Sequence, residues 1–263
     1  MADILPLPGA LSPFMNASGF FGYTPPAAST LTEKLGAFIT PPISQSKRNP
    51  ARNRCLVEVP GGFLLHTGLS NEGFSRVLKQ HGKKWSGLKY PVWPHLLPQS
   101  AYDCRQMVRA LEDVENISAV EISLPDDASP AQLEEWLEAA VGELPIYVCA
   151  PLFSPWQNWL SVFNLYNISG VVLSAPRGSV YHNGALVRGR LYGPSLFPQM
   201  LEALHNNRDC GIPLVAGSGI FSFEQAEMVL QAGASAVQFD ACLWQLSPLT
   251  FPTRSSSEHH SAG

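Results

Sequence analysis

Three carboxylates stand near the ends of apolar runs that have the composition of buried strands. Glu121 and Asp126 are the first and last residues of the stretch EISLPD, and Asp240 directly follows the run at 236–239. The carboxyl ends of parallel strands meet at one edge of a sheet, where ligands bind. Carboxylates gathered there would form an acidic mouth that binds a cation or a cationic partner. The alternative is that they are solvated or cap helices.

Cys149 and three histidines offer two further kinds of chemistry. Cys149 ends the apolar run at 146–149, so a thiol nucleophile is one interpretation and simple apolar packing is the other. His66, His95 and His182 could meet as metal ligands, but none belongs to a local motif such as HxH or HExxH. The sequence therefore predicts no metal site.

The turn Gly217-Ser218-Gly219 has the composition of a phosphate-binding turn. It follows the apolar run at 212–216, and backbone N–H groups in such a turn can donate to a phosphate. Residues 222–232 then predict a helix with Ser222 as its N-cap, before the buried run at 236–239. This strand, helix and strand form the unit with which many (β/α)8 barrels bind a phosphate near their last two strands.

Composition sets the broad class of protein. The chain has 263 residues, 45% of them hydrophobic, and a net charge of −4, which suits one α/β domain and argues against a nucleic-acid-binding surface. No run approaches the roughly 18 apolar residues of a membrane span. The five cysteines form neither a CxxC motif nor a disulfide framework, and the first residues lack the basic region of a signal peptide. We therefore expect a protein of the reducing cytoplasm.

Short apolar runs alternate with helical patterns along most of the chain. This alternation predicts a single-domain (β/α)8 TIM barrel, with a doubly wound sheet as the alternative. Residues 1–32 are expected to be an N-terminal loop segment, 33–251 the barrel and 252–263 a disordered tail. Strands are predicted at 36–40, 90–95, 120–124, 146–149, 170–173, 212–216 and 236–239. Helices are predicted at 74–80, 101–112, 130–141, 156–163, 197–205 and 222–232, and hairpins at 55–65 and 177–190.

Four pieces of sequence, in the same order and spacing, resemble one family of enzymes. They are NASGFFG at 16–22, GAFITPPIS at 36–44, GLSNEGF at 68–74, and GRLYGPSLFPQMLEAL with IPLVAGSGIFSFEQAEMVLQAGASAVQF at 189–239. On these pieces the chain resembles the dihydroorotate dehydrogenases, FMN-dependent barrels of pyrimidine synthesis, as a divergent member. The resemblance covers residues 16–243.

The resemblance implies positions for the cofactor and the substrate. FMN would contact Ala17, Ser18, Gly19, Gly193, Gly217, Ser218 and Gly219, with Asp240-Ala241 at the family's phosphate-binding Gly-Thr. Substrate would lie at Asn71, Glu121 and Asp126, and the family's proton-abstracting base falls on Leu124. The two lysines that the family places beside the flavin fall on Pro41 and Cys149.

These replacements change the expected chemistry. Leu124 cannot accept a proton, and Pro41 and Cys149 supply no cation to the flavin. Glu121 and Asp126 would repel a carboxylated substrate by about 1 to 4 kcal/mol for each close pair, so orotate is a poor ligand. Asp240 would oppose phosphate binding if it points into the mouth, and would leave the site intact if it turns outward to cap a helix.

Two functions follow, and whether the chain is an enzyme stays open between them. One is a non-catalytic binding or assembly subunit, a pseudoenzyme with weak or absent FMN binding, whose small-molecule or protein partner is not identified by the sequence. The other is an FMN-dependent oxidoreductase that acts on a different small substrate. A homo-oligomer is compatible with either function.

Overall fold

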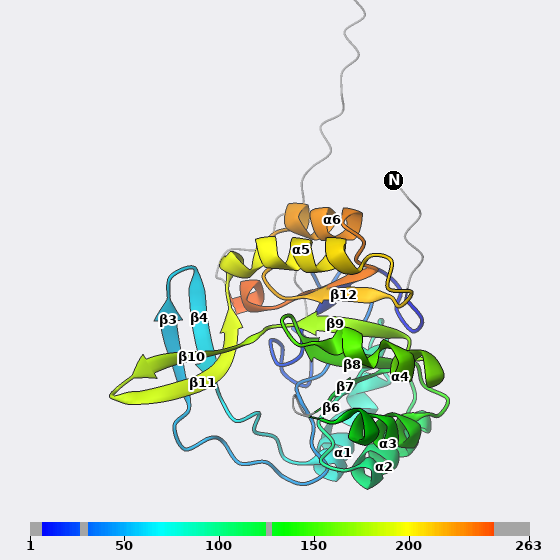
Figure 1. Ribbon diagram of the computed structural model, residues 1–263. Coiled ribbons are helices and arrows are strands. Elements are labelled where there is room, and N and C mark those ends of the chain that lie inside the picture. Colours follow the sequence, from blue (N-terminus) through cyan, green and yellow to red (C-terminus); the bar gives the residue numbers. More distant parts are fainter. Residues whose placement is uncertain (1–6, 27–30, 125–127, 245–263) are drawn as a thin grey trace, which may run out of the picture.

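A curled parallel sheet forms the centre of the computed structural model, which describes residues 7–26, 31–124 and 128–244 (Figure 1). Its strands lie in the order β1-β13-β12-β9-β8-β7-β6. Short branched and aromatic runs form these strands because both of their faces are buried. The bounds are Phe14–Asn16 (β1), His95–Leu96 (β6), Val120–Ser123 (β7), Ile146–Pro151 (β8), Gly170–Ser174 (β9), Leu214–Gly217 (β12) and Ala236–Phe239 (β13).

A second parallel ladder lies beside this sheet. It pairs β2 (Phe38–Ile39) with β5 (Val92–Trp93), and only Pro94 separates β5 from β6. Met15 of β1 forms an isolated bridge with Ala37, just before β2. The Asn16 side chain extends this contact, because its amide donates to the Ile39 carbonyl at 2.7 Å and accepts from the Ile39 N–H at 3.0 Å. A side chain thus supplies the pairing that a longer strand would supply with its backbone.

Helices cover the outer side of the sheet (Figure 1). Serine N-caps define three of their starts: Ser100 accepts from Asp103 N–H, Ser129 forms a capping box with Gln132, and Ser222 accepts from Gln225 N–H. The bounds are Phe74–Trp85 (α1), Ala101–Glu112 (α2), Pro130–Ala140 (α3), Leu160–Leu165 (α4), Phe197–Asn207 (α5) and Phe223–Gln231 (α6). Three 3-10 turns are η1 (Trp156–Trp159), η2 (Pro194–Leu196) and η3 (Ala241–Trp244) within the described chain.

An antiparallel sheet projects from the curled sheet, at the left of Figure 1. Two hairpins build it, β3 (Cys55–Val59) with β4 (Gly62–His66) and β10 (Arg177–His182) with β11 (Ala185–Tyr192), and β11 pairs with β4. Asn183 and Gly184 have φ values of 49° and 77°, as the predicted type I′ turn requires. The sequence predicted both hairpins but not their pairing.

Side chains inside the curled sheet form an apolar layer toward the amino ends of its strands. Trp93 and Tyr147 stack there with ring centroids 4.3 Å apart, and both bond to the segment before β1. The Trp93 indole donates to the Gly9 carbonyl and the Tyr147 hydroxyl to the Pro8 carbonyl. The layer consists of Leu7, Met15, Ala37, Ile39, Trp93, Ala119, Tyr147, Val172, Val215 and Ala236.

Most expected elements are present, with shifted ends. The strand expected at 36–40 is reduced to β2, the helix expected at 74–80 continues to Trp85, and the packed loop expected at the start of the chain contains β1. The helix expected at 156–163 begins as the 3-10 turn η1. The tail at 252–263 lies outside the described residues. None of the described helices has the length and apolar character needed to cross a membrane.

We predict that Asn16→Leu will lower the free energy of unfolding by about 2 to 4 kcal/mol. The leucine fills a similar volume but leaves the buried N–H and carbonyl of Ile39 without partners, and each unpaired group costs roughly 1 to 3 kcal/mol. Urea denaturation measures the change. Asn206→Ala, at an exposed position of α5, serves as the control and should shift stability by less than about 0.5 kcal/mol.

Candidate functional site

A pocket opens at the carboxyl ends of the parallel strands. Along a strand every second side chain points to the inside of the sheet. The residue two places after a member of the apolar layer therefore faces this pocket. Trp93 is thus followed by His95, and Ala119 by Glu121. The cavity has a volume of about 80 Å³. It is lined by Ala17, Ser18, Phe20, Pro42, Leu69, His95, Glu121, Ser123, Cys149, Ser174, Ala175, Arg190, Tyr192, Gly217 and Gln238.

Glu121 is the centre of a buried hydrogen-bond network in the pocket floor. Its side chain is 1% exposed, and Oε1 lies 2.5 Å from His95 Nδ1. Its other oxygen, Oε2, accepts from Gln238 Nε2 at 2.6 Å, and His95 Nε2 lies 3.0 Å from the Ser123 hydroxyl. The two carboxylate oxygens and both imidazole nitrogens are therefore partnered, and the pair can hold or pass a proton at the pocket surface.

Cys149 is buried beside this network. Burial, reinforced by the charge of Glu121, raises the pKa of its thiol to about 11, while Arg190 acts in the opposite direction. The thiol is therefore protonated at neutral pH. Of the two interpretations of Cys149, this protonation state favours packing over a free thiolate nucleophile.

Arg190 brings a cation into the pocket from β11, which no sequence pattern indicated. Its Nη1 donates to the Ala175 carbonyl at 2.7 Å and lies 3.5 Å from the Ser174 hydroxyl. The guanidinium thus lies in the same pocket as Cys149, one of the two positions to which the resemblance assigns a family lysine. Arg190 is positioned by the pairing of β11 with β4 and β10 and by its bond to Ala175, so the linear sequence gave little signal for it.

Asp240 is completely buried at the predicted phosphate turn. Its carboxylate accepts from the Ala241 N–H at 2.6 Å and from the Gly219 N–H at 3.3 Å. It precedes the 3-10 turn η3, so it caps a helical start, yet in doing so it binds the amides that the resemblance assigns to phosphate. Burial raises the pKa of Asp240 to about 7, and the bonds from these two amides only partly offset that effect.

The remaining cofactor positions are also used by the fold. A Cβ on Gly193 would lie 2.2 Å from the Gly61 carbonyl, and one on Gly219 would lie 2.8 Å from the Phe197 nitrogen. Ala17 N–H donates to the Phe239 carbonyl and the Ser18 hydroxyl to the Thr40 carbonyl. Together with Asp240 in the phosphate turn, these contacts use several of the groups that the resemblance assigns to FMN.

The predicted substrate residues are only partly brought together. Glu121 lines the pocket, whereas the Asn71 side-chain amide bonds to Leu69 and Gly73 of its own loop and to Ser44 of the segment after β2. Asp126 lies outside the described residues, so the acidic mouth is tested only for Glu121 and Asp240. Leu124, at the family's base position, is buried. Substrate binding by Asn71 and Asp126 stays a prediction.

The three histidines that were considered as possible metal ligands lie in different parts of the described structure. His66 pairs across the β3–β4 hairpin with Cys55, and His182 lies at the tip of the β10–β11 hairpin, whereas His95 lies in the pocket. The described residues that could share a metal ion are instead His95, Glu121 and Cys149.

Comparison with known proteins identifies the family. Residues 10–141 match the family model described as dihydroorotate dehydrogenase. The chain is 26% identical over 251 residues to a putative dihydroorotate dehydrogenase A (fumarate) of Aquifex aeolicus, covering 86% of this chain and 82% of that protein. It is 25% identical over 253 residues to a dihydroorotate dehydrogenase B (NAD(+)) catalytic subunit of Pelobacter propionicus, with the same coverage. The chain therefore belongs to the dihydroorotate dehydrogenase family, as a divergent member.

We predict that Asp240→Asn will change how stability depends on pH. Because the pKa of Asp240 is raised in the folded protein, ionisation destabilises the wild type as pH rises from about 4 to 7, and the effect levels off above 7. The stability of the variant relative to wild type should therefore grow by about 2 kcal/mol between pH 5 and pH 8. Urea denaturation at each pH measures this difference. The control Asp209→Asn changes an exposed side chain, and its stability relative to wild type should be the same at every pH. If the stability of Asp240→Asn followed the same pH profile as that of wild type, the raised pKa of Asp240 would be wrong.

Proposed function

We propose that the chain folds as a single-domain (β/α)8 barrel spanning residues 33–251, with residues 1–32 contributing the segment that leads into it. The bridge from Met15 to Ala37, the β2–β5 ladder and the continuation of β5 into β6 support closure of the curled sheet. The apolar interior layer supports it too, because its residues come from segments all around the sheet.

We propose further that this barrel is a non-catalytic binding or assembly subunit that does not hold FMN in the family manner. The single observation that carries the proposal is the Asp240 carboxylate, which accepts the N–H groups of Gly219 and Ala241 at the phosphate turn. A phosphate would have to displace a buried group that already satisfies those donors. Above pH 7, the carboxylate charge adds electrostatic repulsion.

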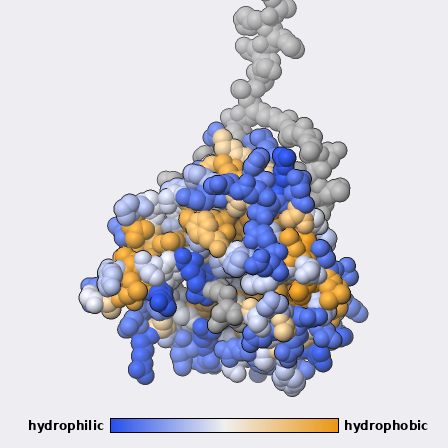
Figure 2. All heavy atoms as spheres, viewed as in Figure 1, coloured by the Kyte–Doolittle hydropathy of each residue, from blue (hydrophilic) through white to orange (hydrophobic). Residues whose placement is uncertain are grey.

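The pocket at Glu121 and Arg190 on its own suits a ligand smaller than a flavin. Its volume of about 80 Å³ is well below the roughly 300 to 1,000 Å³ typical of sites for drug-sized ligands, and a flavin would also have to use the separate cavity of about 400 Å³ beside Gly193 and Ala241. Glu121 and Arg190 place opposite charges on its wall, which suits a small polar molecule. For an assembly role, exposed apolar side chains are available on the antiparallel sheet, including Leu56 and Leu186 (Figure 2).

The test is the visible absorption spectrum of freshly purified protein, followed by titration with FMN. We expect a colourless protein with weak FMN uptake that weakens further as pH rises through 7. Flavin at near-stoichiometric occupancy would overturn the proposal.

We predict that Asp240→Gly combined with Ala241→Thr will tighten FMN binding by at least about tenfold. The double variant frees two backbone donors and restores a hydroxyl at the phosphate turn, and a gain of about 1.4 kcal/mol corresponds to tenfold. Fluorescence titration with FMN measures the affinity. Ala241→Thr alone keeps the carboxylate in the turn and should give no such gain. Equal affinities for wild type and the double variant would contradict the role of Asp240.

The second candidate function is an FMN-dependent oxidoreductase acting on a different small substrate. Arg190 favours it, because a guanidinium in the pocket could replace the missing lysines as the cation beside a reduced flavin. The names of the relatives, which are dihydroorotate dehydrogenases matched over most of their length, favour it as well. If FMN does bind tightly, Arg190→Leu should lower the flavin reduction potential and Arg190→Lys should largely preserve it.

A further inference from the structure

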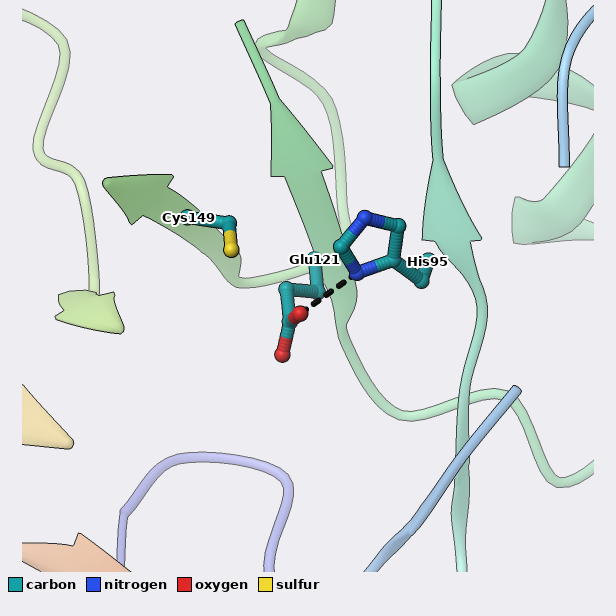
Figure 3. Close-up of side chains that lie close together, drawn as sticks. All are labelled: His95, Glu121 and Cys149. Carbon is teal, nitrogen blue, oxygen red and sulfur yellow. Dashed lines mark hydrogen bonds and ion pairs between the residues drawn. The ribbon is translucent and has the colours of Figure 1, made fainter. Parts of the chain in front are cut away.

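We propose that His95, Glu121 and Cys149 form a binding site for one divalent transition-metal ion, with zinc as the best match (Figure 3). The proposal is independent of how the phosphate turn behaves. It concerns the floor of the pocket, whereas the flavin argument concerns the turn at Gly219 and Ala241.

The three side chains converge because their strands are neighbours. His95 of β6 is the register partner of Glu121 in β7, and Ser123 of β7 is the partner of Cys149 in β8. Each residue faces the pocket, and their ligand atoms all lie within 4.8 Å of one another. A tetrahedral zinc ion with bonds of about 2.0 to 2.3 Å holds its ligand atoms roughly 3.3 to 3.7 Å apart. Small side-chain rotations therefore suffice to close the site.

Neighbouring groups already orient two of the ligands. The Ser123 hydroxyl lies 3.0 Å from His95 Nε2, and Gln238 Nε2 donates to Glu121 Oε2 at 2.6 Å. These contacts leave His95 Nδ1 and Glu121 Oε1 facing each other, 2.5 Å apart. An ion bound by both atoms would take the place of their direct hydrogen bond, with Nε2–H then donating to Ser123. Metal-binding histidines and carboxylates commonly have such secondary partners.

The donor set selects the type of ion. An imidazole nitrogen, a thiolate and a carboxylate suit zinc and similar transition metals, whereas magnesium and calcium prefer oxygen ligands alone. Coordination would deprotonate the Cys149 thiol and release its proton to solvent. The cavity of about 80 Å³ beside the three ligands has room for water as the fourth ligand. Arg190, the cation on the same wall, would balance the charge of the thiolate and the carboxylate.

The test uses the full chain, stripped with a chelator and then titrated with Zn²⁺ or Co²⁺ alone. We expect one ion per chain, and with Co²⁺ an absorption band from thiolate-to-cobalt charge transfer. Cys149→Ser should abolish that band. Ser123→Ala and Gln238→Leu, which remove the orienting partners and leave all three ligands, should weaken metal binding by about 10- to 100-fold.

Cys55→Ser is the matched control, because it removes the thiol of another possible metal site. Cys55 lies opposite His66 across the β3–β4 hairpin, and this pair could itself bind a metal ion. Cys55→Ser should leave the stoichiometry and the charge-transfer band unchanged. The proposal is overturned if wild type takes up no ion, if the band survives Cys149→Ser, or if it disappears in Cys55→Ser. Should Cys149→Ser fail to fold by circular dichroism, unchanged metal affinity in Ser123→Ala and Gln238→Leu would overturn it equally.

Discussion

The burial of the Glu121 carboxylate is the constraint on which the rest of the pocket depends. A charged group that is 1% exposed costs several kcal/mol unless it is fully partnered. Its partners are His95 on the neighbouring strand and Gln238 on β13, on another part of the curled sheet. The bond from Gln238 ties β13 to β7, two strands that share no backbone ladder. The bond to His95 joins β7 to its ladder neighbour β6.

The family scaffold is retained while its charges have been redistributed. Pro41 and Cys149 stand where the resemblance places two lysines, and Arg190 of the antiparallel hairpin brings a cation into the pocket. At the phosphate turn, the Asp240 carboxylate accepts hydrogen bonds from the protein's own backbone amides. Arg190 thus supplies the positive charge that the resemblance assigns to the lysines, and the Asp240 carboxylate takes the amides that it assigns to the FMN phosphate. Glu121 and Asp240 are therefore partnered by groups of the chain itself.

Local features of the fold could be predicted from the sequence, whereas long-range placements could not. The serine caps of α2, α3 and α6 and the Asn183-Gly184 turn are local, and a short stretch of sequence specifies each one. Strand β1 was missed because its three residues gain their stability from β13 and from the Asn16 side chain. Arg190 was missed because contacts between distant segments, the pairing of β11 with β4 and the bond to Ala175 near the end of β9, position it. The orientation of the Asp240 side chain is set by its bonds to the N–H groups of Gly219 and Ala241. The spacing of residues in the sequence does not show that the Gly219 N–H lies within reach.

The pairing of β1 with β13 has a consequence for how the protein is made. These are the first and last described strands, so during synthesis the edge of β1 that pairs with β13 stays uncovered until Ala236–Phe239 has emerged from the ribosome. Contacts between such distant segments form slowly, and an unpaired strand edge is prone to associate with other chains. A nascent chain that stops before Ala236 would lack the strand that covers β1. Its apolar interior would then stay open to solvent and to neighbouring nascent chains.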